Sequence, residues 1–217
     1  MTRTASHNVH RNSAHAVAGY AGLALVALGA ALLVPLAVLP FYPQETGLAP
    51  GFLFPGVCAM LVGYLVYFFG ARDAAALTLS RAEAAGVTVI IWISAIAVFA
   101  VPLVLSGVLT IPQAIFEATS GLTTTGLSVV DVAACPRIVL MHRGMMHYMG
   151  GVGLILVLTC IVSDSHGLKM YNAEGHTERL LSSTAGAARM VLVLYTGIIL
   201  IGTVAYVIAG MPVFDAI

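Results

Sequence analysis

Charged residues are scarce in this sequence. Only 8% of its 217 residues are Asp, Glu, Lys or Arg, and nine basic and nine acidic residues cancel to a formal net charge of 0. The mean hydropathy is +1.01. A soluble domain of this size does not carry so much apolar surface, so the composition indicates an integral membrane protein. The balanced charge and the lack of a basic stripe argue against a nucleic-acid partner.

Cysteine is also rare, and the sequence lacks the residue clusters that catalysis or metal binding needs. Cys58, Cys135 and Cys160 show no C-x-x-C spacing, which argues against a disulfide framework or a metal site. They are interpreted as small buried apolar residues, with a lone thiol at Cys135 as the alternative. His142 and His147 are five residues apart and do not share a helical face. We therefore expect no catalytic residues, no bound metal and no tightly bound cofactor.

Long, largely apolar segments dominate the chain. A helix needs about 20 apolar residues to cross the hydrocarbon core of a bilayer. Segments of sufficient length and apolarity lie at 17–40, 51–70, 86–107, 137–162 and 190–210. The sequence therefore predicts an all-α membrane protein embedded in the lipid bilayer.

The spans and polar segments give a predicted organisation. Its parts are a solvated tail at 1–16, two leading transmembrane helices with their loops at 17–85, a helix–loop–helix unit at 86–162, a cytoplasmic linker at 163–189, and the start of a second unit at 190–217.

The distribution of basic residues predicts the orientation. Arg137 lies in a segment on one side of the membrane, and Arg143 lies just within the following span. The segments on the other side carry the remaining basic residues: Arg3, Arg11, Arg72, Arg81, Lys169, Arg179 and Arg189. Because cytoplasmic loops are enriched in Lys and Arg, the N-terminus is predicted to be cytoplasmic and the segment after the third span external.

A polar strip interrupts the apolar pattern between the third and fourth spans. It reads F-E-A-T-S-G-L-T-T-T-G-L-S-V-V at 116–130. The segment 112–121 before the threonines is about half as long as a spanning helix, so it is either an external loop or a segment that dips into the bilayer and returns. Irregular backbone at membrane depth is tolerated where it lines a watery cavity. Carbonyl groups in such a cavity can replace the water around a cation, and glycine permits the backbone angles this requires.

The strip is followed later in the chain by a partial repeat of its surroundings. Gly107, Pro112 and F-E-A at 116–118 come after the third span, and Gly210, Pro212 and F-D-A at 214–216 come after the fifth. Internal repeats are a common way to build transporters and channels. The second copy stops where its own short helix begins, so we expect this chain to be part of a longer protein.

Three segments together resemble one family. A-I-F-E-A-T-S-G-L-T-T-T-G-L-S at 114–128, M-H-R-G-M-M-H-Y-M-G-G-V-G at 141–153 and I-G-T-V-A-Y-V-I-A-G-M-P-V-F-D-A-I at 201–217 are similar, in order and spacing, to TrkH-type potassium uptake proteins. That family belongs to a superfamily with KtrB and the plant HKT transporters. The two leading spans match the extra N-terminal pair of the TrkH branch.

The resemblance implies a fold of four helix–pore loop–helix units around a central pore in one polypeptide. It implies permeation of K⁺, sometimes Na⁺, in the cell membrane. It also implies a homodimer of the full-length pore subunit and a cytoplasmic nucleotide-binding regulatory ring of the TrkA type. This chain holds one complete unit and the first helix of a second. A non-conducting membrane remnant or accessory subunit is therefore the alternative.

The resemblance also assigns roles to residues. The segment 112–121 would be a pore helix, and 123–127 would be a selectivity filter that acts through the backbone carbonyls of Thr123, Thr124, Thr125, Gly126 and Leu127. An ordinary external loop with a Thr-Gly turn is the plainer interpretation.

Further residues are expected to support the pore. Glu117 would brace the strip or deepen the negative field, and bracing is favoured. Asp131 would attract cations or be an ordinary solvated aspartate. Arg143 is expected to be a structural brace paired with an acid of the pore loop. Gly150, Gly151 and Gly153 would allow close helix approach or loosen the inner helix for gating.

Overall fold

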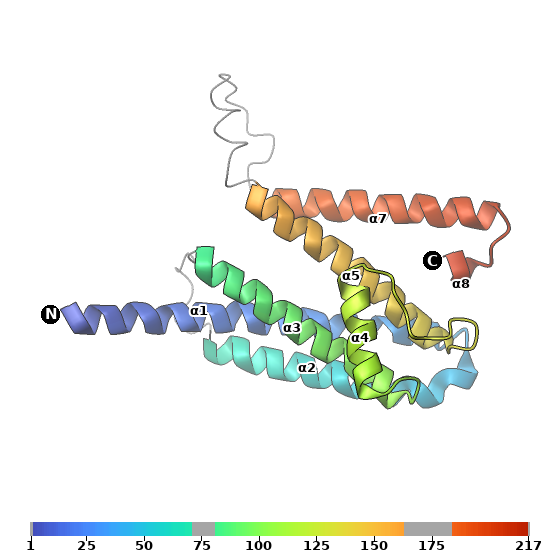
Figure 1. The fold of residues 1–217 in the computed structure, drawn as a ribbon, viewed down its shortest axis with the longest axis horizontal. Helices are drawn as coiled ribbons and strands as arrows, with labels where there is room; N and C mark the ends of the chain where they lie inside the picture. Colours follow the sequence, from blue (N-terminus) through green and yellow to red (C-terminus); the bar gives the residue numbers. More distant parts are fainter. Residues whose placement is uncertain (1, 71–80, 163–183, 217) are drawn as a thin grey trace, which may run out of the picture. The chain divides into compact units, whose positions relative to one another are not determined.

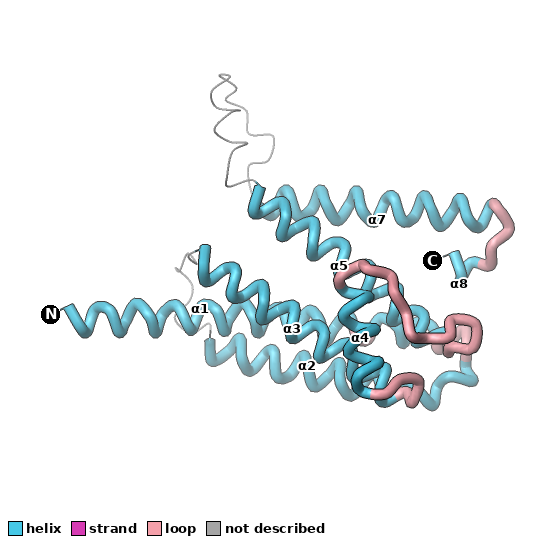
Figure 2. The backbone as a smooth tube through the Cα atoms, in the orientation of Figure 1, coloured by secondary structure: helices cyan, strands magenta, loops and turns pink. Residues whose placement is uncertain are grey.

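A computed structural model describes residues 2–70, 81–162 and 184–216, and this part of the chain is helical, with no strand (Figures 1 and 2). The α-helices are α1 (Thr2–Ala31), α2 (Ala49–Gly70), α3 (Arg81–Leu105), α4 (Ile111–Leu122), α5 (Arg137–Val162), α7 (Thr184–Ile208) and α8 (Val213–Ala216). Two 3₁₀ helices, η1 (Val34–Val38) and η2 (Pro43–Leu48), connect α1 to α2.

Four stretches within the described residues are long and apolar enough to cross a membrane. They are His15–Val38, Pro43–Gly70, Ala82–Leu105 and Ala188–Ile208. These stretches correspond to four of the spans predicted from sequence, which confirms an all-helical membrane protein. The remaining predicted span, 137–162, is a single helix, α5, but is not among the four, so its crossing stays a prediction.

Some predicted boundaries differ from those in the structure. The predicted tail at 1–16 is helical from Thr2, and the last part of the predicted linker is helical from Thr184. Alanine is frequent in both stretches and is the strongest helix former, so their polarity did not prevent a helix. The rest of the linker and residues 71–80 of the second connection lie outside the described residues.

The chain divides into two compact units, Met1–Met146 and His147–Ile217, with the boundary inside α5. In the first unit α1 packs against α2 and α3, and α3 packs against α4. Glycines bring α1 and α2 together: a Cβ atom added to Gly63 would lie 2.7 Å from the carbonyl oxygen of Gly22. Small residues that let helix backbones approach are typical of membrane helix pairs.

The first helix ends earlier than the sequence pattern predicts. The apolar run continues to residue 40, but α1 ends at Ala31 and η1 contains Pro35. Proline lacks the backbone N–H that a continuing α-helix requires. The chain then turns through η2, which places Glu45 in its first turn.

Helix α4 is short and well capped. It covers the predicted 112–121 and adds one residue at each end. Thr110 and Gln113 form a capping box, and Pro112 lies in the first turn, where its missing N–H breaks no helical hydrogen bond. Its 12 residues extend about 18 Å, less than a bilayer core. Gly121 packs closely against α5, because an added Cβ would lie 2.9 Å from the Met146 Cβ. This contact sets the distance between α4 and α5.

The second unit contains the rest of α5, α7 and α8. The hydroxyl groups of Tyr148 and Thr196 are 2.8 Å apart, and the rings of Tyr148 and Tyr195 are 5.7 Å apart. After α7 the chain turns at Gly210, whose φ of +96° favours glycine, and α8 begins just after Pro212.

Candidate functional site

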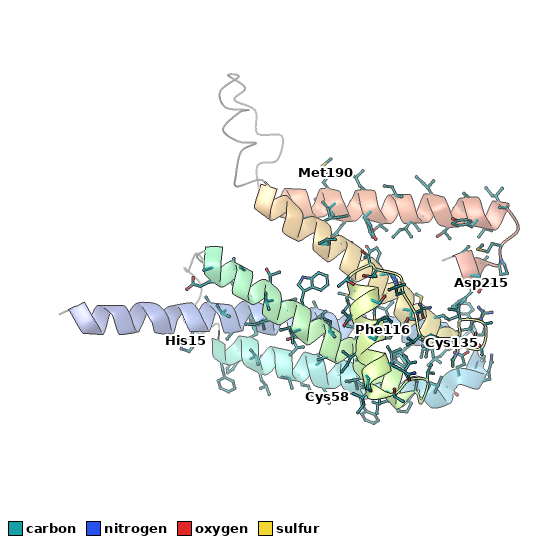
Figure 3. The ribbon with its side chains drawn as sticks, viewed as in Figure 1. His15, Cys58, Phe116, Cys135, Met190 and Asp215 are labelled. Atoms are coloured by element: carbon teal, nitrogen blue, oxygen red, sulfur yellow. The ribbon has the colours of Figure 1, made fainter. Side chains whose placement is uncertain are left out.

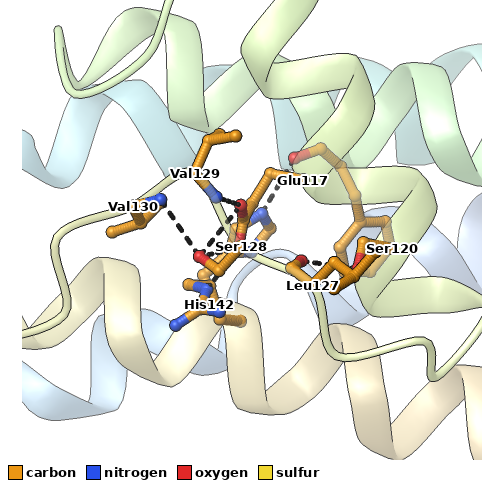
Figure 4. A network of polar contacts seen from close by, with 9 residues as sticks. Glu117, Ser120, Leu127, Ser128, Val129, Val130 and His142 are labelled. Carbon is orange, nitrogen blue, oxygen red and sulfur yellow. Dashed lines mark hydrogen bonds and ion pairs between the residues drawn. The ribbon is translucent and has the colours of Figure 1, made fainter.

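A buried carboxylate joins α4 to the strip of residues that follows it. Glu117 is only 2% exposed. Its oxygens accept hydrogen bonds from the Ser128 hydroxyl at 3.0 and 3.1 Å and from the Val129 backbone N–H at 3.0 Å (Figure 4). We call residues 123–130 the threonine loop. Glu117 thus anchors the last part of the threonine loop to the helix that precedes it.

An arginine from α5 neutralises this carboxylate. The Arg143 Nε donates to Glu117 Oε1 at 2.6 Å, and the Arg143 side chain is 14% exposed. A buried carboxylate without a partner would carry a large desolvation cost. The sequence predicted that Arg143 pairs with an acid of this segment, and Glu117 is that acid in the structure. Glu117 therefore connects α4, α5 and the threonine loop.

The backbone of the threonine loop is unusual at two positions. Thr124 has φ +55°, the only positive φ at a non-glycine among the described residues, and Gly126 has φ +81°. Thr123, between α4 and Thr124, has φ −81°. Non-glycine residues rarely adopt positive φ, and such residues cluster at functional sites. Turn hydrogen bonds hold this conformation: the Thr124 N–H donates to Gly121 O at 3.0 Å and the Thr125 N–H to Ser120 O at 2.9 Å.

The carbonyl groups of the threonine loop fall into two kinds. Within the described part of the chain, the carbonyl oxygens of 123–126 accept no hydrogen bond. The Leu127 carbonyl differs, because the Ser120 hydroxyl donates to it at 2.6 Å. All of these residues are exposed. Four consecutive carbonyl groups are therefore available to a cation, and the fifth predicted one is already hydrogen-bonded to α4.

The structure also locates the other predicted residues. Asp131 is exposed and accepts a hydrogen bond from the Ala133 N–H at 3.1 Å, so it closes a local turn. Gly151 lies against Tyr195 in the second unit, where an added Cβ would overlap the tyrosine hydroxyl, and so allows close helix approach. An added Cβ on Gly153 would meet nothing within 4 Å. Gly150 is buried.

His142 is fully buried on α5, beside the site. Its Nε2 is 2.9 Å from the Phe99 carbonyl oxygen, and its ring stacks on that of Phe99 at 5.2 Å. Phe52 meets the same ring edge-on at 5.4 Å. The imidazole therefore packs α5 against α2 and α3. Among the described residues, no group of three or more His, Cys, Asp or Glu is arranged to hold a metal ion.

Sequence reasoning missed one residue near the site. Glu45 of η2 accepts hydrogen bonds from the backbone N–H groups of Arg137 at 2.8 Å and Ile138 at 2.9 Å, the first two residues of α5. The available signal was Pro136, which precedes α5 and offers no side-chain cap, so that the helix needs an acceptor from elsewhere.

Cys135 is expected to react slowly with thiol reagents. It lies in the connection between the threonine loop and α5 (Figure 3), and burial raises the pKa of its thiol from 9.0 to about 11, although the nearby Arg143 opposes the shift. The reactive thiolate is therefore about 100-fold rarer at pH 7.5 than for an exposed cysteine. The rate of labelling by iodoacetamide should keep rising between pH 7 and pH 9 without reaching a plateau. Val132→Cys in a Cys135→Ser background, at an exposed position, is the control. Equal labelling rates at pH 7.5 would contradict this expectation.

Comparison with known proteins agrees with the helical fold. The family described as TrkH, cation transport protein, matches residues 60–214. The chain is 28% identical over 195 residues to an uncharacterized cation transporter of Methanocaldococcus jannaschii, covering 88% of this chain and 40% of that protein. It is 33% identical over 140 residues to the Trk system potassium uptake protein TrkG of Escherichia coli, covering 60% and 29%.

Two comparisons extend over more of the chain. The Trk system potassium uptake protein TrkH of Salmonella typhimurium is 28% identical over 211 residues, which is 93% of this chain and 43% of that protein. The crystal structure of the potassium transporter TrkH from Vibrio parahaemolyticus superposes with a TM-score of 0.76 at 23% identity, over 93% of this chain and 41% of that one. The chain thus spans less than half the length of the relatives it matches.

The helical fold and the family match over residues 60–214 define an all-helical membrane protein of the cation-transporter class. The chain belongs to the TrkH family of cation transport proteins.

Proposed function

We propose that this chain contributes part of a K⁺ uptake pathway, in which the carbonyl oxygens of the threonine loop coordinate the ion as it passes. The supporting observation is the row of four carbonyl groups, 123–126, that accept no hydrogen bond among the described residues. Two of the named relatives, TrkG of Escherichia coli and TrkH of Salmonella typhimurium, are potassium uptake proteins. Coordination and release of an ion form and break no covalent bond, so the proposed role involves no enzymatic activity.

Backbone conformation supports this use of the carbonyl groups. Where right- and left-handed residues alternate, successive N–H groups converge on one side of the chain, which turns the carbonyl groups to the other. Thr123 has negative φ, Thr124 positive, Thr125 not positive and Gly126 positive. Carbonyl dipoles on one side can replace the hydration shell of K⁺. Leu127, with its carbonyl hydrogen-bonded to Ser120, would contribute less than the other four.

Helix α4 would act as a pore helix in this arrangement. Its C-terminus ends at Leu122, next to the carbonyl groups, and the partial negative charge of a helix C-terminus favours a cation. Glu117 and Arg143 together would hold the threonine loop in shape. Their charges compensate each other, so bracing is a better role for Glu117 than attraction of the ion. Asp131 would lie at the external mouth.

The proposal places the chain in the cell membrane with a cytoplasmic N-terminus and the threonine loop outside, as the basic residues predict. One strand of carbonyl groups does not close a ring. The chain would therefore form one quarter of a four-unit pore, with α7 and α8 beginning the second unit. The complete pore subunit would form a homodimer and bind a cytoplasmic nucleotide-binding ring of the TrkA type. Whether Na⁺ also passes is an outcome of the test.

Potassium uptake by cells tests this proposal. The complete natural reading frame that contains this chain should restore growth at low K⁺ to a host without its own K⁺ uptake, and should accumulate Rb⁺. Residues 1–217 alone, expressed at the same level, serve as the control. Correct membrane insertion of the complete product without any K⁺-dependent growth or Rb⁺ accumulation would instead support a non-conducting membrane protein.

A further inference from the structure

The N-terminus of α5 depends on a residue from a distant part of the chain. The first N–H groups of a helix have no partner within the helix. Those of Val139 and Leu140 donate to the Pro136 carbonyl oxygen, both at 3.1 Å. Those of Arg137 and Ile138 are left for another acceptor, and Pro136 has no side-chain acceptor to offer.

Glu45 satisfies both of these groups. One carboxylate oxygen accepts from Arg137 and the other from Ile138, across 92 and 93 residues of sequence. A negative charge at this point also complements the positive end of the helix dipole. The contact joins the loop between the two leading helices to the first turn of α5.

We propose that Glu45 is a positioning residue for the threonine loop, acting through α5. This inference rests on the proposed function, because the effect it predicts is on ion binding. Within the described part of the chain, the hydrogen bonds of Glu45 go to α5 and not to the threonine loop. It fixes the start of α5, the helix whose Arg143 holds Glu117, which in turn holds Ser128 and Val129.

The distance along α5 between the residues that Glu45 caps and Arg143 is short. Arg137 and Arg143 are six residues apart, about 9 Å along the helix. A shift of the first turn therefore moves the guanidinium group that holds Glu117. Cys135, just before the helix, lies within electrostatic range of both Glu45 and Glu117. The leading helix pair thereby contributes to the shape of the threonine loop without lining it.

Ion competition distinguishes positioning from simple stabilisation. In the complete natural reading frame, Glu45→Ala should raise the K⁺ concentration for half-maximal uptake by up to about tenfold, the equivalent of a lost helix cap. It should also make uptake more sensitive to Na⁺. Glu45→Gln keeps one acceptor and should recover part of the change. The adjacent exposed Gln44→Ala is the matched control and should match the wild type.

A second measurement does not require transport. Hydrogen exchange followed by mass spectrometry on the same purified proteins should show faster exchange of the 123–130 amides in Glu45→Ala and not in Gln44→Ala. If Glu45→Ala lowers only the amount of protein, with half-saturation, Na⁺ sensitivity and exchange unchanged, the inference is overturned. If the wild type takes up no K⁺, the proposed function fails, and the exchange result alone decides whether Glu45 positions the loop.

Discussion

Replacing Glu117 by alanine is expected to destabilise the first unit and to abolish K⁺ uptake. The substitution removes the carboxylate to which three groups donate: the Arg143 guanidinium, the Ser128 hydroxyl and the Val129 N–H. Breaking a buried ion pair by removing one partner costs about 3–5 kcal/mol. We expect a value of about 3 kcal/mol, because Arg143 keeps 14% of its side chain exposed and can recover some hydration. Thermal unfolding in detergent and Rb⁺ uptake measure the two effects.

Two further variants test the reason for this loss. Glu117→Gln can still accept from Ser128 and Val129 but no longer neutralises Arg143, so it should lie between wild type and alanine. The double variant Glu117→Ala, Arg143→Ala removes both members of the ion pair. Its loss of unfolding free energy should therefore be smaller than the sum of the losses in Glu117→Ala and Arg143→Ala measured singly. Strict additivity would show that the contact between the two residues does not contribute to stability.

Replacing Gly126 by serine is expected to weaken discrimination between K⁺ and Na⁺ and to lower stability without creating a steric clash. An added Cβ would meet no atom within 4 Å, so the change creates no clash. The residue has φ +81°, which costs a non-glycine residue about 1–2 kcal/mol. The backbone can relieve this strain by rotating, and rotation changes the direction of the adjacent carbonyl groups. The ratio of Rb⁺ to Na⁺ uptake measures the effect.

Gly107 provides the matched control for this substitution. It has φ +72°, it also has open space around an added Cβ, and it lies between α3 and α4 rather than in the threonine loop. Gly107→Ser should therefore show the same conformational cost with unchanged ion discrimination. Equal discrimination in Gly126→Ser and the wild type would contradict the assignment of 123–126 as ion ligands.

The long uncharged runs and the local chemistry of the sequence were sufficient to predict much of the fold. The uncharged runs predicted four helices that have the length and apolarity of membrane spans, and the short segment before the threonines corresponds to α4. The pairing of Arg143 with an acid could be anticipated because a charge near the membrane interior needs a partner. In the structure this acid is Glu117, which lies 26 positions earlier in the chain.

The contacts that could not be predicted from the sequence join segments whose sequences show no common motif or spacing. Ser120 donates to Leu127 because α4 ends and the chain returns across its last turn, a geometry that follows from φ at Thr124 and Gly126. Nothing in a Thr-Thr-Thr-Gly sequence requires a threonine to adopt positive φ. The Glu45 contact depends on how α2, α3 and α5 pack, with His142 between Phe52 and Phe99. Tertiary packing, not propensity, determines both.

The distance in sequence between Glu45 and the start of α5 also has a consequence for biosynthesis. A ribosome adds about 5–20 residues per second, so the 92 residues that separate Glu45 from Arg137 take roughly 5–18 seconds to make. During that interval α2, α3 and α4 are synthesised, and Glu45 has no helix to cap. Arg143 emerges later still, and Glu117 has no counter-charge until it does. The threonine loop can therefore reach its final shape only after α5 has been synthesised, which makes it one of the last parts of the first unit to form.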